Sequence, residues 1–427
     1  MREDMLHFIW KYKKLQLENV YTSKNESIVI EDVGTHNHLA GPDFFNARIN
    51  IDGQLWAGNV EIHLKSSDWY AHHHEKDSNY NNVILHVVWE DDVSVFRKNN
   101  TEIPVLELKK YVSENVLEGY QALLNNKRKV FINCEKDLKY IDSFLMQHWL
   151  DRLYLERLER KSELVWELLS LSKNDWEKVL FILLLKNFGS KINADSFLSI
   201  GTALDFLIVR KVREHSFRLE SILFGIAGLL EDDLIVDEYY IRLKEEYQYQ
   251  KHKFQIDVRG VQKPGFFKLR PANFPTIRLS QVASLYHTHQ NLFSQLISAV
   301  SLEEIYKIFD VAASPYWYTH FSFGKISRKS GKKLSKKFID LIVINTILPL
   351  KFCYSKDKGV DVGDEIIKIA SELDKEENTV VHSFKNYGFK ASNAFESQSI
   401  LQLYNEYCSK NRCLQCAVGN HLLNRNG

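Results

Sequence analysis

Hydrophobic positions in the N-terminal part of the chain switch between helical and strand periodicity. Apolar residues at helical spacing predict a helix over residues 3–17: Met5, Ile9, Tyr12 and Leu15. Alternating or continuous apolar runs predict strands at residues 27–33, 44–51, 55–65, 83–89 and 103–108. These segments predict a sheet with at least one helix packed on it.

Polar stretches between the runs supply the connections. Asp52-Gly53 is a strong signal for a hairpin turn between two of the strands, and residues 68–80 predict a short helix. The expected order is therefore α-β-β-β-α-β. We expect a mixed α+β chain in which this small unit is followed by a mainly α-helical body.

The helical body is predicted from about residue 143 onward. Apolar residues repeat at threes and fours, and no proline occurs between Pro104 and Pro264. Three prolines within residues 255–285 predict an irregular connector. Further helices are expected at residues 291–310, 333–350, 362–374 and 392–408.

A length of 427 residues favours about three domains of ordinary size. The patterns divide the chain into an α/β domain, a helical domain, a helical domain with a basic and aromatic segment, and a cysteine-containing tail. The expected bounds are residues 1–125, 126–255, 256–400 and 401–427. The apolar runs are far shorter than the ~18 residues of a membrane span, and the N-terminal sequence resembles no secretory signal, so we expect a cytoplasmic protein without a membrane partner.

Charge and histidine are unevenly distributed along the chain. The formal net charge of +1 combines −7 for residues 1–120, with 12 basic and 19 acidic residues, and +8 for the remainder. Residues 251–350 hold 15 basic and 5 acidic residues, and eight of the 16 histidines lie before residue 91. A neutral total therefore does not exclude a local polyanion-binding surface.

Candidate chemistry is densest between residues 41 and 92. Asp43 precedes one predicted strand, and Glu61, His63 and Lys65 share a face of the next, because residues two apart on a strand point the same way. Two carboxylates on adjacent strands suit Mg²⁺ or Mn²⁺, and a basic or imidazole group beside the metal suits activation of a water. The alternative is a simple turn at Asp43 and an ion pair between Glu61 and Lys65.

Further polar groups follow in the same stretch. His74 and Tyr80 are candidates to line the site, and the run His72-His73-His74 leaves a transition-metal site open, although HExxH and its inverse are absent. His86 lies in an apolar strand and is interpreted as a hydrogen-bonded core histidine.

Pro42-Asp43 followed by Glu61-Ile62-His63, in an α-β-β-β-α-β unit, resembles the PD-(D/E)XK phosphodiesterase superfamily of nucleases. The resemblance implies that Asp43 and Glu61 hold the metal. His63 stands where the superfamily has lysine, and Lys65 is the candidate substitute. The superfamily often adds an acid from the first helix, for which Glu3 and Glu18 are candidates.

Most of the chain also resembles a bacterial family classed as a domain of unknown function, and this resemblance implies no activity. The stretches that carry it are AGPDFFNARI, GNVEIHLKSSDW, NVILHVV, RPANFPTIRLSQ and CLQCAVG.

The segment 315–337 is basic and aromatic. Its candidate nucleic-acid-binding residues are Trp317, Lys325, Arg328, Lys329, Lys332 and Lys333. Aromatic rings stack on unpaired bases and cations neutralise phosphates, so the segment suits contact with DNA or RNA. The alternative is a solvated lysine-rich loop beside core aromatics.

Cys408, Cys413 and Cys416 form a C-x4-C-x2-C motif with His421 nearby. This spacing suits a structural zinc, and His421 favours zinc over an iron–sulfur centre. Cys134 and Cys353 are the remaining thiols. Some nucleases of the resembled superfamily close their fold with an iron–sulfur staple from distant cysteines, and that resemblance implies Cys134 as the fourth ligand.

The sequence thus predicts a metal-dependent phosphodiesterase acting on nucleic acid. GxxxxGK[ST], GxGxxG and GxSxG motifs are absent, so P-loop, dinucleotide and α/β-hydrolase chemistries have no anchor. The alternative is a non-catalytic protein that binds nucleic acid or a partner through a degenerate nuclease-like fold, which His63 in place of lysine favours.

Overall fold

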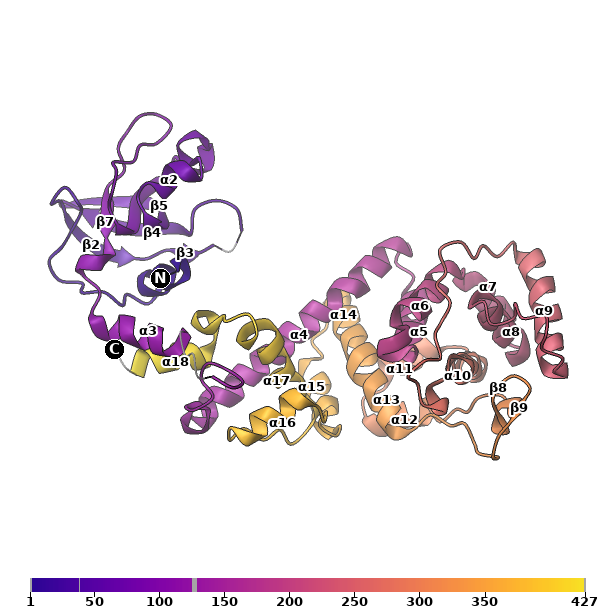
Figure 1. Ribbon diagram of the computed structural model, residues 1–427. Helices are drawn as coiled ribbons and strands as arrows, with labels where there is room; N and C mark the ends of the chain where they lie inside the picture. Colours follow the sequence, from indigo (N-terminus) through magenta and orange to yellow (C-terminus); the bar gives the residue numbers. More distant parts are fainter. Residues whose placement is uncertain (1, 38, 125–128, 426–427) are drawn as a thin grey trace. The chain divides into compact units, whose positions relative to one another are not determined.

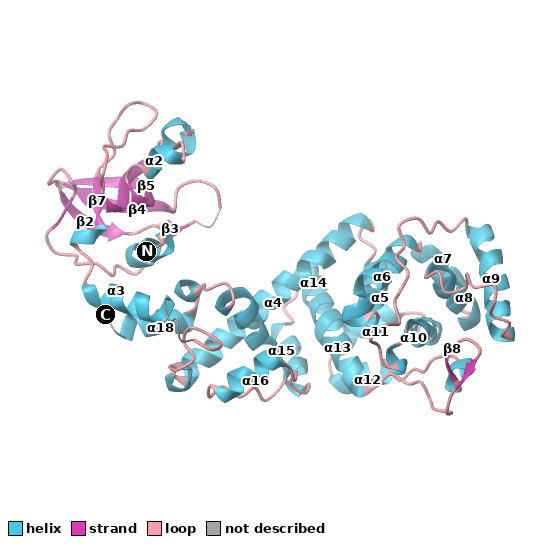
Figure 2. Cartoon of the chain, in the orientation of Figure 1, coloured by secondary structure: helices cyan, strands magenta, loops and turns pink. Residues whose placement is uncertain are grey.

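The computed structural model describes residues 2–37, 39–124 and 129–425, which form two compact units. The first unit holds Met1–Trp149, Asn386–Phe389 and Leu403–Gly427. The second holds Leu150–Lys385 and Lys390–Gln402. The C-terminal segment therefore belongs with the N-terminal sheet. Figure 2 shows the strands concentrated in the first unit and helices dominating the second.

The first unit is built on a seven-stranded mixed sheet in the order β1-β2-β4-β5-β6-β7, with β3 paired to β4. The strands are β1 (Val20–Tyr21), β2 (Ser27–Asp32), β3 (Thr35–His36), β4 (Phe44–Ile51), β5 (Gln54–Lys65), β6 (Val83–Glu90) and β7 (Val105–Glu107). The pairs up to β4–β5 are antiparallel, whereas β5–β6 and β6–β7 are parallel. The expected mixed α+β chain with an N-terminal sheet and a mainly helical body is confirmed.

The hairpin between β4 and β5 turns at Asp52 and Gly53, as the sequence predicts. Both residues have positive φ, 49° and 83°. This backbone twist matches the twist of the flanking strands, and Asp-Gly adopts it at low cost.

The first unit also contains helices. They are α1 (Glu3–Lys11), α2 (Asp68–Ala71), α3 (Glu114–Leu124) and α18 (Ala417–Arg425), and α4 (Ser143–Leu171) begins in this unit. Of these, α1 and α2 contact the sheet. α1 packs on β5, and α18 lies beside α3 (Figure 1). α1 is shorter than predicted, because Lys13 adopts a φ of 50° that a helix does not accommodate.

The predicted helix at 68–80 is shorter and interrupted. α2 is followed by two 3₁₀ turns, His74–Lys76 and Ser78–Tyr80. The interruption is at His73, whose φ of 60° is left-handed. The break turns the chain so that His72 and His74 are presented by different elements.

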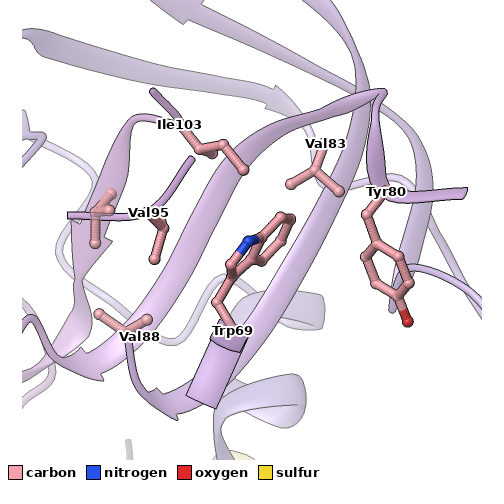
Figure 3. Packing of buried hydrophobic residues seen from close by; sticks show 7 residues of the cluster. Trp69, Tyr80, Val83, Val88, Val95 and Ile103 are labelled. Carbon is pink, nitrogen blue, oxygen red and sulfur yellow. The ribbon is translucent and has the colours of Figure 1, made fainter. Parts of the chain in front are cut away.

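Trp69 anchors this segment on the sheet. Its ring is fully buried among residues from β6 and the following loop, including Val83, Val88 and Val95 (Figure 3). Its indole nitrogen donates a 3.1 Å hydrogen bond to the backbone oxygen of Phe96, which satisfies the one polar group of the side chain.

The second unit is helical apart from one small hairpin. Its helices are α5 (Trp176–Phe188), α6 (Ser190–Ala203), α7 (Phe206–Val212), α8 (Ser216–Ile226), α9 (Glu238–Phe254), α10 (Pro275–Thr288), α11 (Leu292–Ser298), α12 (Leu302–Ile308), α13 (Lys336–Ile342), α14 (Leu348–Lys358), α15 (Gly363–Glu372), α16 (Thr379–Asn386) and α17 (Ala394–Gln402). The hairpin pairs β8 (His320–Ser322) with β9 (Lys325–Ile326).

Several features of this unit differ from the predicted elements. The hairpin of β8 and β9 was not predicted, and the single helix expected at residues 291–310 is divided into α11 and α12. The expected connector at residues 255–285 contains the start of α10, because Pro275 occupies the first turn of that helix, where a missing N–H costs nothing. α16 was not predicted.

Among the described residues, Lys336–Lys358 forms one continuous helix long and apolar enough to cross a membrane. The pair α6 and α7, bent by 81°, passes the same test together. Within Lys336–Lys358, 72% of the most apolar 18-residue stretch is buried inside the unit, and a core helix passes the same test.

Replacing Trp69 is expected to destabilise the first unit. Trp69→Ala removes a buried ring and should lower the free energy of local unfolding by about 3–5 kcal/mol. The measurement is hydrogen–deuterium exchange of β5 and β6 amides in the full chain. Trp56→Ala is the matched control, because Trp56 in β5 is 42% exposed, and its effect should stay within about 0.5 kcal/mol. Equal effects of the two changes would contradict the assignment of Trp69 as the anchor.

Candidate functional site

The carboxylates of Asp43 and Glu61 are held together by reciprocal hydrogen bonds to the backbone. The Asp43 N–H donates to Glu61 Oε2 at 3.1 Å, and the Ile62 N–H donates to Asp43 Oδ2 at 2.9 Å. The antiparallel pairing of Phe44 with Val60 sets this register. The predicted convergence of the two acids is therefore present in the fold.

Three imidazoles complete the cluster. His74 Nε2 lies 3.2 Å and His63 Nε2 3.4 Å from Glu61 Oε1. His72 Nδ1 lies 3.1 Å from His63 Nε2. One ligand atom from each of His63, His72 and His74 falls within 4.8 Å of the others, which is a spacing that suits a bound cation. The site therefore combines imidazole nitrogens with carboxylate oxygens.

His63 is braced from behind by His86. Its Nδ1 lies 2.8 Å from His86 Nε2. Burial lowers the pKa of His63 to about 2 and that of His86 to about 3, so both rings are neutral at physiological pH. Because His86 engages Nδ1 of His63, Nε2 of His63 faces the cluster. A second residue commonly orients a metal-binding histidine in this way. The interpretation of His86 as a hydrogen-bonded core histidine is confirmed.

α1 brings two more titratable groups to the site. His7 Nε2 lies 3.2 Å from Asp43 Oδ2. Burial acts to lower the pKa of His7, but Asp43 outweighs it and the pKa rises. Burial, and then the charge of Asp43, raises the pKa of Glu3. The structure thus brings Glu3 to the cluster, whereas Glu18 is exposed in the loop after α1.

His7 was not singled out in the sequence. The signal was available in the sequence, because His7 stands four residues after the candidate Glu3. Residues four apart lie on one face of a helix.

Glu61 has the most perturbed carboxyl group of the site. Burial, followed by repulsion from Asp43, raises its pKa to about 9. The neighbouring imidazoles do not offset this, since burial lowers the pKa of both His63 and His74. A divalent cation at this position would supply the missing positive charge, so the donor set and the electrostatics both fit a metal.

Tyr80 and Lys65 take different positions. The Tyr80 ring stacks on His74 with centroids 3.8 Å apart, and burial raises its pKa to about 12. It therefore supports the orientation of His74. Lys65 stands at the end of β5 with an exposed side chain whose charge acts on Asp92, outside the cluster.

Trp317 is buried, contrary to its predicted role in nucleic-acid binding. The ring is fully buried, and its Nε1 donates a 2.6 Å hydrogen bond to Glu220 Oε1. A ring in this position is not available to stack on a base. For this residue the alternative interpretation, a core aromatic, is correct.

The candidate cations of the same segment differ in their exposure to solvent. Lys332 is also buried, with its ammonium 3.7 Å from the ring centroid of Phe321. Lys333 is exposed but lies 2.7 Å from Asp310. Lys325, Arg328 and Lys329 are exposed.

The C-terminal thiols share a cavity in the first unit with a fourth thiol. Cys134, Cys408, Cys413 and Cys416 line it together with Asn133 and other residues. His421, the predicted fourth ligand, lies on α18 and is not among the lining residues. All five cysteines of the chain are free thiols.

Comparison with known proteins gives one match. A family model described as "Protein of unknown function (DUF2851)" matches residues 3–379. No curated protein and no solved structure matches the chain.

Metal binding at the imidazole cluster is expected to depend on His74 and not on the adjacent His73. His74→Ala should weaken Mn²⁺ or Zn²⁺ binding by about 10-fold or more, because one ligand is removed. His73→Asn is the matched control, since His73 is exposed and asparagine tolerates its left-handed backbone. Isothermal titration calorimetry measures both variants, and equal affinities would argue against the cluster as the site.

The affinity for metal is expected to rise with pH. A cation has to displace the Glu61 proton, and the pKa of Glu61 is raised to about 9. Between pH 7 and 8.5 the affinity should increase about tenfold per pH unit and then level off. His63 and His74 add no slope there, because their pKa values are lowered and both are already neutral. Calorimetric titrations across this range, with Glu61→Gln expected to be weak and flat, provide the check.

Proposed function

We propose that this chain, which belongs to the DUF2851 family, is a metal-dependent phosphodiesterase that acts on nucleic acid. The observation that carries the proposal is the convergence of Asp43, Glu61 and three imidazoles. They meet where the start of β4 pairs with β5, at the end of the hairpin away from its turn. The proposal's support from the fold is that, with the two-residue strands β1 and β3 set aside, the order α1, β2, β4, β5, α2, β6 resembles the α-β-β-β-α-β unit expected for the PD-(D/E)XK superfamily.

The donor set favours Mn²⁺ over Mg²⁺. Carboxylates suit both ions, but imidazole suits transition metals and is a poor ligand for Mg²⁺. Asp43 and Glu61 would supply oxygen ligands, while His63, His72 and His74 would supply nitrogen ligands. Zn²⁺ fits the nitrogen ligands equally well and is the competing ion.

A metal bound here would polarise a phosphate oxygen and lower the pKa of a bound water. Glu3, whose pKa is raised by burial and then by the charge of Asp43, is the carboxyl group of α1 proposed to take the proton of the attacking water. His7 holds Asp43 from α1. His63 does not act as a cation, because its pKa is lowered to about 2.

The substrate class is argued from charge. A phosphodiester backbone is a polyanion, and exposed lysine and arginine side chains bind it by displacing counterions. The second unit offers Lys325, Arg328 and Lys329 on its own surface. With Trp317 buried, we propose contact through phosphates rather than through base stacking.

A second candidate is nucleic-acid binding without cleavage. The observation in its favour is that His63 is neutral and buried at the position of the superfamily's lysine, while Lys65 is exposed outside the cluster. Under this alternative the exposed cations bind the polyanion and the cluster does not turn it over.

Cleavage is expected with Mn²⁺ and should depend on Asp43. The full chain is incubated with end-labelled single-stranded, duplex and branched DNA and RNA, in Mn²⁺, Zn²⁺ or Mg²⁺. Asp43→Asn should lower the rate by about 10²–10³-fold, because it removes a ligand and a charge that stabilise the metal. Lys65→Ala should change it by no more than about twofold, since that side chain lies outside the cluster.

Glu31→Gln is the matched control for Asp43→Asn, because Glu31 is an exposed acid on β2 of the same sheet. No cleavage in any of the three metals would overturn the enzyme proposal. Salt-dependent binding that survives Asp43→Asn, without turnover, would establish the second candidate instead.

A further inference from the structure

Four of the five cysteines meet in the first unit, away from the carboxylate cluster. Cys134 lies in the turn before α4, and Cys408 ends a π-helical stretch, Leu403–Cys408. Cys413 and Cys416 flank the 3₁₀ turn Cys413–Gln415 that precedes α18. All four line one cavity of about 10 Å³, close to the space that a single water molecule needs.

The surroundings of the sulfurs are those of metal-bound thiolates. Asn133 Nδ2 donates to Cys413 Sγ at 3.2 Å, and backbone N–H groups of Val418 and Gly419 donate to Cys416. Such bonds stabilise negative charge on sulfur and accompany iron–sulfur and zinc centres. A Cβ on Gly419 would lie 2.0 Å from the Cys413 oxygen, so this close turn accepts only glycine.

No disulfide joins these cysteines, since all four are free thiols.

Four thiolates suit two kinds of metal centre. They bind one zinc ion tetrahedrally, and they also hold iron–sulfur clusters. The cavity that the four cysteines line brings all four side chains to one place, as either centre requires.

We propose that Cys134, Cys408, Cys413 and Cys416 hold one metal centre as four thiolate ligands, either a zinc ion or an iron–sulfur cluster taken up preformed. Each thiol loses its proton to solvent as its sulfur bonds to the metal, so no disulfide forms or breaks and no electron is transferred. The centre joins the C-terminal segment to the residues before α4, two parts of the chain separated in sequence by the second unit.

The four-thiolate centre also braces α1, the helix that carries Glu3 and His7. The turn Cys413–Gln415 packs against α1, and Asn420 Nδ2 donates a 3.0 Å hydrogen bond to the Tyr12 hydroxyl just after that helix. Its role is structural and does not depend on the proposed phosphodiesterase activity.

The test is the composition of the full chain purified without oxygen. Iron, zinc and acid-labile sulfide are measured on the same sample, before and after addition of Zn²⁺. About one zinc per chain, or about two to four iron atoms with equal sulfide and broad visible absorption, would support the proposal and identify the centre. Neither metal above trace amounts, even after addition of Zn²⁺, would overturn it.

Two substitutions identify the fourth ligand. Cys134→Ser should lose most of the bound metal, whereas His421→Ala should retain it. Cys353→Ser is the matched control, because Cys353 is a buried thiol of the second unit that does not line the cavity. Loss of metal in His421→Ala with retention in Cys134→Ser would overturn the assignment. If Cys134→Ser does not fold, His421→Ala still tests the assignment, because loss of its metal would contradict it.

Discussion

Glu61 is buried next to Asp43, and the cost of that arrangement shapes the first unit. A carboxylate out of water beside a second carboxylate is unfavourable unless it is neutralised or shares a cation. The protein keeps the two acids together with backbone hydrogen bonds across β4 and β5 and surrounds Glu61 with neutral imidazoles. Stability alone would favour apolar residues here, and perturbed carboxyl groups of this kind are frequent at functional sites.

Several elements converge to hold the cluster in place. The parallel pairing of β5 with β6 sets His86 opposite Glu61, from where it reaches the neighbouring His63. Trp69 fastens the segment that presents His72 and His74, and α1 delivers Glu3 and His7. The turn Cys413–Gln415, which contributes Cys413 to the thiol cavity, packs against α1, so the proposed metal centre would brace the helix that completes the site.

The sequence predicted much of the first unit because its signals are local. The strand at residues 44–51 and the turn at Asp52-Gly53 follow from alternation and turn chemistry within a few residues. Asp43 and Glu61 were identified as partners because a hairpin forces adjacent strands into contact. The start of α10 was missed, because three nearby prolines were interpreted as breakers and Pro275 instead begins the helix.

The sequence by itself determined the mixed α+β class, the pairing of Asp43 with Glu61 and the grouping of three C-terminal thiols. Only the tertiary structure decided which distant residues join them: His7 and Glu3 from α1, and Cys134 in the thiol cavity where His421 had been expected. It also decided that Trp317 is a core residue. The reason is physical: periodicity and turn chemistry act over a few residues, whereas burial and ligand geometry depend on contacts between segments far apart in the chain.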